Sequence, residues 1–224
     1  MEISQYRDRF HAGTELAKRL VEYKNKENTI VLGLPRGGVP VAQRIAAELN
    51  LPLDVFLVRK LGVPGHEELA FGAIANGGEP IINHEIIEQL NISDEIIKNL
   101  IEHQTKVLNE RLHLYRKNKD SLSVLGKTII LVDDGLATGS TMEAAIKALQ
   151  IQQPEKIVVA VPVAAHDSIH RIAHLADQIV CPLVPDLFYA VGLWYQNFRQ
   201  TSDDEVVNLL ETCKNQKSSN LNGQ

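Results

Sequence analysis

The sequence predicts an α/β domain with a central, mostly parallel sheet of five strands flanked by helices. Two observations support this prediction. Segments rich in β-branched residues alternate along the chain with segments of helical periodicity. The strand segments are also continuous apolar runs, which are typical of parallel strands buried on both faces. The 224 residues, 44% hydrophobic and 23% charged, have the composition of one ordinary globular domain.

Each expected strand is short and is bounded by glycine, proline or charged residues. In chain order the expected strands are 29–33, 53–58, 128–132, 156–161 and 178–181. The expected helices carry apolar residues on one face, as in 142–149, where such residues recur at i, i+3, i+4 and i+7. They are 15–23, 39–49, 142–149 and 167–175. Because the first helix precedes every strand, we expect it to pack on one side of the sheet.

A long insertion over 59–120 interrupts the alternation. It opens with the loop LGVPGHEELAFG, continues through the strand-like pieces AFGAIA and EPIIN, and ends in a long helix with Ser93 as the expected N-cap. The apolar face of that helix consists of Ile97, Leu100, Ile101, Leu108, Leu112 and Tyr115. A long glycine-bearing loop on a compact domain usually carries function, so we expect the opening loop to be mobile.

No repeat or linker divides the chain, so we expect a single domain over 1–213 and a disordered polar tail over 214–224. The apolar runs are far shorter than the roughly 18 residues that span a bilayer, and the charged N-terminal segment does not resemble a signal peptide. We therefore expect a cytoplasmic protein with no membrane partner. Cys181 and Cys213 lack metal-ligand spacing and should be free thiols. A net charge of −5 disfavours nucleic acid as a partner.

The most informative segment is IILVDDGLATGST, residues 129–141. An apolar strand ends in Asp133 and Asp134, where ligands of parallel sheets bind, and two adjacent carboxylates can accept hydrogen bonds from vicinal hydroxyls. The turn that follows leads into a helix, and its backbone N–H groups and hydroxyls suit a phosphate monoester. The expected phosphate cradle consists of Ala137, Thr138, Gly139, Ser140 and Thr141. Together these elements describe a site for a sugar phosphate.

This segment resembles the phosphoribosyl diphosphate (PRPP) binding motif of type I phosphoribosyltransferases, and the resemblance in fold, to a bacterial branch of that family, extends over most of the chain. It implies a type I phosphoribosyltransferase-like fold and an enzyme of nucleotide metabolism that transfers the 5-phosphoribosyl group of PRPP to a nitrogenous base and releases pyrophosphate. It also implies a homodimer. The alternative is a Mg²⁺-binding acidic pair in another kind of α/β protein.

A second segment, GLPRGGVPVA at 33–42, follows the first strand, where type I enzymes carry the loop that holds pyrophosphate. The resemblance gives this role to Arg36, Gly37 and Gly38, because a guanidinium can grip diphosphate oxygens and glycines leave N–H groups unobstructed. The alternative is a turn that needs glycine for packing alone. The implied cofactor is Mg²⁺, held mainly by the diphosphate and ribose, with Asp133 or Asp134 touching it directly or through water.

Arg59 and Lys60 end the second strand and open the expected mobile loop, in the place of the family's flexible catalytic loop. Negative charge grows on the leaving pyrophosphate, so a cation that arrives with the loop would stabilise the transition state. These two residues are therefore the catalytic candidates, and a solvated surface pair is the alternative. For His66, Glu67 and Glu68 a solvated loop is the favoured interpretation.

Aromatic residues make up 5% of the chain but gather in 181–200, after the last strand. Type I enzymes place there the hood that covers the acceptor base. The rings of Phe188, Tyr189 and Trp194, or that of Tyr195, could stack on a heterocycle. A C-terminal hydrophobic cover or a dimer interface explains the same residues equally well.

One departure from the family narrows the acceptor. Where 6-oxopurine phosphoribosyltransferases carry an Asp before the Thr-Gly pair, this chain has Ala137, which disfavours hypoxanthine and guanine as acceptors. The alanine resembles the motif of adenine and xanthine enzymes and of purine repressors. Two functions stay open, a phosphoribosyltransferase and a PRPP-sensing regulatory module without turnover.

Overall fold

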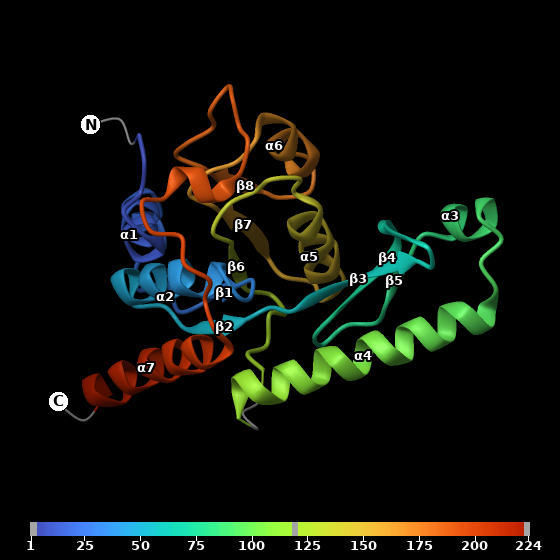
Figure 1. Ribbon diagram of the computed structural model, residues 1–224. Coiled ribbons are helices and arrows are strands. Elements are labelled where there is room, and N and C mark those ends of the chain that lie inside the picture. The colour runs from blue at the N-terminus through green and yellow to red at the C-terminus, as the bar shows by residue number, and fades with distance from the viewer. Residues whose placement is uncertain (1–3, 118–120, 222–224) are drawn as a thin grey trace.

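The computed structural model describes residues 4–117 and 121–221, and a parallel sheet forms its centre (Figure 1). Among these residues, five strands make up this sheet in the order β2-β1-β6-β7-β8, and every neighbouring pair is parallel. The strands are β1 (Thr29–Gly33), β2 (Leu53–Val55), β6 (Thr128–Val132), β7 (Lys156–Ala160) and β8 (Gln178–Val180). The predicted fold class is confirmed.

Both faces of the sheet are buried, which explains why its strands are continuous apolar runs. Along β1, Val31 belongs to one hydrophobic cluster, whereas Ile30 and Leu32 belong to the other. The helices of the first cluster are α1 (Arg9–Arg19), α2 (Gly38–Leu49), α4 (Asp94–Arg116) and α7 (Asp203–Leu221). Those of the second are α5 (Ser140–Ile151) and α6 (His166–Ile172).

The first helix begins six residues earlier than the sequence predicts and ends at Arg19, before the short 3-10 helix η1 (Val21–Tyr23). The early start follows from Asp8, whose carboxylate accepts a hydrogen bond from the backbone N–H of His11 at 2.8 Å and so caps the first turn. This N-cap brings Arg9 into the helix, at its first position.

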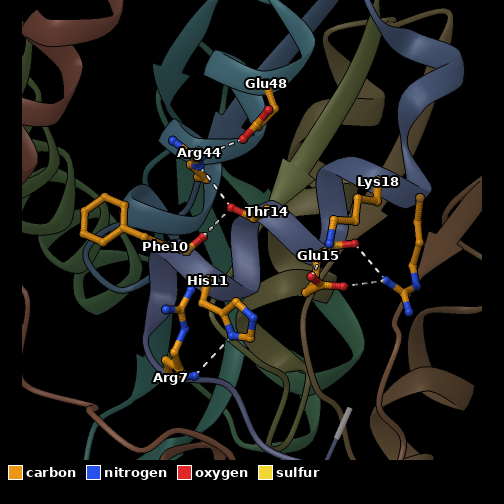
Figure 2. Close-up of polar contacts among 9 residues, drawn as sticks. Arg7, Phe10, His11, Thr14, Glu15, Lys18, Arg44 and Glu48 are labelled. Carbon is orange, nitrogen blue, oxygen red and sulfur yellow. Dashed lines mark hydrogen bonds and ion pairs between the residues drawn. The ribbon is translucent and has the colours of Figure 1, made fainter. Parts of the chain in front are cut away.

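Helix α1 packs closely on α2. A Cβ added at Gly13 would lie 2.7 Å from the Cβ of Arg44, so this position requires glycine. Figure 2 shows Arg44 reaching Thr14 of α1, whose hydroxyl accepts from Nε at 3.0 Å, while the Arg44 guanidinium also pairs with Glu48 at 2.7 Å. These contacts hold α1, and with it Arg9, in a defined place relative to the sheet.

The insertion forms an antiparallel sheet, which includes the strand-like pieces AFGAIA and EPIIN as well as the opening segment, where the sequence predicts a mobile loop. The strands of this sheet are β3 (Val58–Val63), β4 (His66–Ala75) and β5 (Ile81–Ile82), and the short helix α3 (His84–Gln89) follows. The segment LGVPGHEELAFG is thus a hairpin, held in place because Leu61 and Phe71 are fully buried in the first cluster. The expected strand 53–58 is split, since Phe56 and Leu57 lead from the central sheet into β3.

Helix α4 begins as predicted, with the Ser93 hydroxyl accepting a hydrogen bond from the N–H of Ile96 at 3.4 Å. Figure 1 shows it as a long rod that passes under β3 and β4 and reaches beyond the central sheet. A buried ion pair ties its end to β2. Arg116 Nη2 lies 3.0 Å from Asp54 Oδ2, and the two side chains are 11% and 9% exposed.

The C-terminal helix α7 is not among the helices that the sequence predicts. It includes residues 214–221, for which the sequence predicts a disordered tail, and 222–224 lie outside the described residues. Its first turns are anchored by Val206 and Leu210 in the first cluster, and a helix already nucleated extends at little cost. None of the helices in the described ranges is long and apolar enough to cross a membrane.

Replacing Arg116 by alanine should lower the free energy of unfolding by about 3 to 5 kcal/mol, because it leaves the buried Asp54 carboxylate without its cation. Urea unfolding followed by circular dichroism measures this change. The control is Lys98→Ala, which removes an exposed pair with Glu102 and should shift the stability by less than about 0.5 kcal/mol. Equal effects of the two substitutions would show that the Arg116 pair does not anchor α4.

Candidate active site

The candidate site lies where the chain changes direction across the sheet. From β1 the chain crosses over α2 to β2 on one side, and from β6 it crosses over α5 to β7 on the other. Strands β1 and β6 are neighbours, with Gly33 paired to Val132 at their carboxyl ends. The loops after these two strands therefore diverge and leave a crevice, which is where open α/β sheets bind ligands. Both sequence motifs, 33–42 and 129–141, meet there.

The glycine turn after β1 packs directly against the two carboxylates after β6. A Cβ at Gly37 would lie 1.9 Å from Asp134 Oδ2, and a Cβ at Gly38 would lie 2.9 Å from the Cα of Asp133. Neither position accommodates a side chain, and the Pro35–Arg36 peptide that precedes them is cis. The turn and the acidic pair thus form one compact unit.

Asp134 is already paired within the chain. Arg9 Nε donates to Asp134 Oδ2 at 2.7 Å, and Arg9 Nη2 lies 2.7 Å from the same oxygen. The two side chains are only 10% and 15% exposed. Asp133 differs, because its Oδ1 accepts from the N–H of Asp134 at 2.9 Å while Oδ2 receives no hydrogen bond from any described residue. Asp133 is therefore the carboxylate with free acceptor capacity.

The C-terminal segment holds Arg9 in its place. Arg9 Nη1 donates to the carbonyl oxygen of Arg199 at 2.8 Å, and its guanidinium carbon lies 3.9 Å from the centre of the Phe198 ring. The hydroxyl of Tyr195 donates to the backbone oxygen of Asp134 at 2.6 Å. A carboxylate, a backbone carbonyl and the face of an aromatic ring therefore surround the Arg9 guanidinium. These contacts compensate its positive charge for the loss of water on burial.

Burial raises the pKa of Asp133 well above its ordinary value, and the charge of the adjacent Asp134 raises it further. Burial also raises the pKa of Asp134, but there the charge and the hydrogen bonds of Arg9 oppose the rise. Asp134 is therefore the member of the pair that ionises more readily. A cation or hydroxyl donor arriving beside Asp133 would favour its ionised form in the same way.

The expected phosphate cradle forms the turn into α5. Gly139, the N-cap, has a φ of 73°, and a Cβ there would lie 3.3 Å from the Cβ of Ser168. The hydroxyls of Thr138 and Ser140 lie 3.0 Å apart, and Ala137, Thr138 and Thr141 are exposed. The Ser168 hydroxyl donates to the carbonyl oxygen of Ala137 at 2.5 Å, which supports the turn from below.

Arg59 and Lys60 lie on opposite faces of β3, as neighbours in a strand must. Arg59 faces α4, where its Nε donates to Gln104, and it lines a cavity of about 50 Å³ together with Pro35 and Thr141. Lys60 lines a different and larger cavity, of about 770 Å³, which Ser140 also lines. The hairpin thus brings one cation to each side of the start of α5.

The predicted hood residues have unequal positions. Phe188 and Trp194 pack on a small cluster with the buried rings of Tyr6 and Tyr195, whereas Tyr189 is 78% exposed. Trp194 belongs to the 3-10 helix η2 (Val191–Trp194). A Cβ at Gly135 would lie 2.6 Å from Val191, so η2 covers the segment that directly follows the acidic pair. The segment predicted as the hood therefore adjoins the crevice, and its role over an acceptor base stays a prediction.

Two arginines near the crevice were not identified from the sequence. Arg9 pairs with Asp134, and Arg111 of α4 lines the same cavity as Arg59. Neither belongs to a local motif, and for Arg9 the available signal was Asp8, whose N-cap position would have placed α1 correctly. No cluster of three or more His, Cys, Asp or Glu side chains suited to a metal occurs in the described part of the chain.

The family model for the phosphoribosyl transferase domain matches residues 2–191. Rv0571c of Mycobacterium tuberculosis, provisionally named a phosphoribosyl transferase, is 44% identical over 91% of this chain and 46% of its own length. The ribose-phosphate pyrophosphokinase of Mycoplasma genitalium is 26% identical over 85% of this chain and 42% of its own length. The chain spans about half the length of the curated relatives it matches.

Among solved structures, TT1426 from Thermus thermophilus is similar to this chain over nearly its whole length. The two are 40% identical, the TM-score is 0.82, and the match covers 92% of this chain and 97% of TT1426. The resemblance on which the sequence analysis relies is confirmed by these comparisons.

The two aspartates should respond to substitution in opposite directions. Asp134→Asn should lower the free energy of unfolding by about 3 kcal/mol, because it leaves the buried Arg9 charge uncompensated. Asp133→Asn should raise the free energy of unfolding at pH 7, since it removes a carboxylate whose pKa is raised in the folded state.

The gain from Asp133→Asn should shrink as the pH falls and disappear below about 3.9, the ordinary pKa at which Asp is also protonated in the unfolded chain. Urea titrations of both variants between pH 3 and pH 8 test this. Destabilisation by Asp133→Asn at pH 7 would contradict the assignment of Arg9 to Asp134 alone.

Proposed function

This chain belongs to the phosphoribosyl transferase domain family, and we propose that it binds PRPP with Mg²⁺ and transfers the 5-phosphoribosyl group to a nitrogenous base, releasing pyrophosphate. The observation that supports this most is the contact between the glycine turn and the acidic pair at the change of direction in the sheet. A diphosphate on the turn and a 5-phosphate at the start of α5 would place the ribose over the carboxylates between them.

Each motif has a distinct task in this proposal. Arg36, Gly37 and Gly38 form the diphosphate site, Arg36 through its guanidinium and Gly37 through its backbone N–H. The N–H of Gly38 donates to the Leu34 carbonyl oxygen at 3.0 Å, so Gly38 contributes by closing the turn and leaving room for the ligand. Asp133 accepts hydrogen bonds from the ribose hydroxyls through its free oxygen. The turn of Ala137, Thr138, Gly139, Ser140 and Thr141 binds the 5-phosphate. Asp134 holds the turn and Arg9 in position beside them.

The donor set fits Mg²⁺ as a substrate-borne cofactor, because this ion retains several waters and takes one or two carboxylates alongside phosphate oxygens. Asp133 would hold it directly or through water, with Asp134 as the less available member of the pair. When bound, the ion neutralises charge on the diphosphate. The chain's own contribution at the leaving group comes from Arg59 and Lys60 of the hairpin.

The acceptor is proposed to lie between the crevice and the hood, where Phe188, Tyr189 and Trp194 supply aromatic surface. Ala137 leaves the crevice without the base-facing carboxylate of 6-oxopurine enzymes. We therefore propose adenine, xanthine or a related heterocycle before hypoxanthine or guanine. A cytoplasmic location and a homodimer complete the proposal.

The decisive experiment is measurement of pyrophosphate release from PRPP and Mg²⁺ across a panel of nucleobases. Release with at least one base supports the transferase. If the protein binds PRPP but releases no pyrophosphate with any base, the transferase is rejected and the PRPP-sensing module remains. In such a module, PRPP binding alters the interaction with a protein partner or the oligomeric state. Absence of PRPP binding would overturn both functions.

Gly37→Ala should weaken PRPP binding by about 100-fold, because the new Cβ would lie 1.9 Å from Asp134 Oδ2 and displace either the turn or the carboxylate. Gly78→Ala is the matched control, since its Cβ meets only Gln152 Nε2, at 3.6 Å, an ordinary contact. Calorimetric titration with PRPP compares the two. Wild-type affinity in Gly37→Ala would place the diphosphate elsewhere.

Arg59→Ala and Lys60→Ala should each lower kcat by about 100-fold while the PRPP affinity changes far less, as expected of residues that act on charge developing in the transition state. Steady-state kinetics and PRPP titration of the same variants provide the comparison. A parallel loss of affinity and of kcat would instead assign these residues to binding of the ground state.

A further inference from the structure

Three arginines from distant parts of the chain gather beside the glycine turn. Arg36 belongs to that turn, Arg59 to β3 and Arg111 to the C-terminal half of α4. Arg59 and Arg111 line one cavity of about 50 Å³, whose other walls include Leu34 and Pro35 of the turn and Thr141 of the phosphate cradle. Such a gathering of cations is unusual in a chain with a net charge of −5.

Helix α4 positions two of these cations through one stripe of its surface. Gln104, Leu108, Arg111 and Tyr115 follow each other at helical spacing and therefore share a face. Leu108 and Tyr115 are buried, each 2% exposed, and Gln104 accepts the hydrogen bond of Arg59. Arg111 is exposed although it lies between two buried positions, because the cavity opens at that point. It thus projects from the inner face of α4 into the cavity.

Carboxylates near this group are few. The Arg36 guanidinium lies 4.0 Å from Asp203, which also accepts the hydrogen bond of the Tyr115 hydroxyl. Among the side chains that the structure describes, which do not include those of Glu67 and Glu68, no carboxylate forms an ion pair with Arg59 or Arg111. Burial lowers the pKa of Arg59, and the charge of Arg111 lowers it further, so the two cations are close enough to repel each other. A bound polyanion would relieve this repulsion.

We propose that Arg111 is a further cation of the diphosphate site, and that with Arg36 it binds the pyrophosphate end of PRPP, next to Arg59, whose main effect is on the charge that grows as pyrophosphate leaves. The proposal rests on the proposed function, since it extends the diphosphate site described above. Arg36 approaches from the turn, and Arg59 and Arg111 approach from the side of α4. The phosphate at the start of α5 is bound by other residues, so Arg111 distinguishes the two phosphate ends of the substrate.

The test is calorimetric titration of Arg111→Gln with two probes, inorganic pyrophosphate with Mg²⁺ and ribose 5-phosphate. Pyrophosphate affinity should fall by about 10- to 100-fold, the loss expected for one charge-assisted hydrogen bond, while ribose 5-phosphate affinity stays unchanged. Arg111→Lys should recover part of the loss, because it keeps the charge but not the two-pronged geometry. The control on the same helix is Lys98→Gln, about 20 Å away along the axis, which should change neither affinity.

If the wild type binds both probes and Arg111→Gln leaves pyrophosphate affinity unchanged, the role of Arg111 is overturned and the proposed function stands. Equal losses for both probes would overturn it too, since they would indicate a general disturbance of the site. A wild type that binds neither probe would overturn the proposed function and the role of Arg111 with it.

Discussion

The ion pair between Arg9 and Asp134 connects the parts of the molecule that form the crevice. Asp134 follows β6, its carboxylate fills the space against Gly37 of the turn after β1, and its backbone oxygen accepts the Tyr195 hydroxyl. Arg9 joins the start of α1 to the carbonyl of Arg199. One buried carboxylate therefore determines the relative positions of four segments, and each of them contributes to the site.

In this arrangement the two members of the acidic pair have different contacts, although the sequence alone presents them as equivalent residues. The Asp134 carboxylate is paired with Arg9, whereas Asp133 has one carboxylate oxygen that can accept hydrogen bonds from a ligand. A similar division applies to the cations, because adjacent residues of β3 must point to opposite faces, so Arg59 and Lys60 serve different cavities. Sequence adjacency therefore brings such residues to one element but does not give them the same surroundings.

Local pattern predicted the central sheet well, because the middle of a strand buried on both faces needs apolar residues in succession, as at 30–32 in β1 and 129–132 in β6. The same pattern indicated where the two loops of the crevice lie, because these loops directly follow β1 and β6. It did not predict the hairpin, whose strands are held by tertiary burial of Leu61 and Phe71. Arg9 and Arg111 also escaped prediction, because their partners lie far away in the sequence.

The contacts of Arg9 also bear on the order in which the molecule can assemble during synthesis. During synthesis Arg9 leaves the ribosome 125 residues before Asp134 and 190 residues before Arg199. Strands β1, β2 and β6 can pair before the last of these residues has left the exit tunnel, whereas the full set of Arg9 contacts cannot. A nascent chain would therefore acquire these strand pairings before the full set of contacts that fixes the crevice.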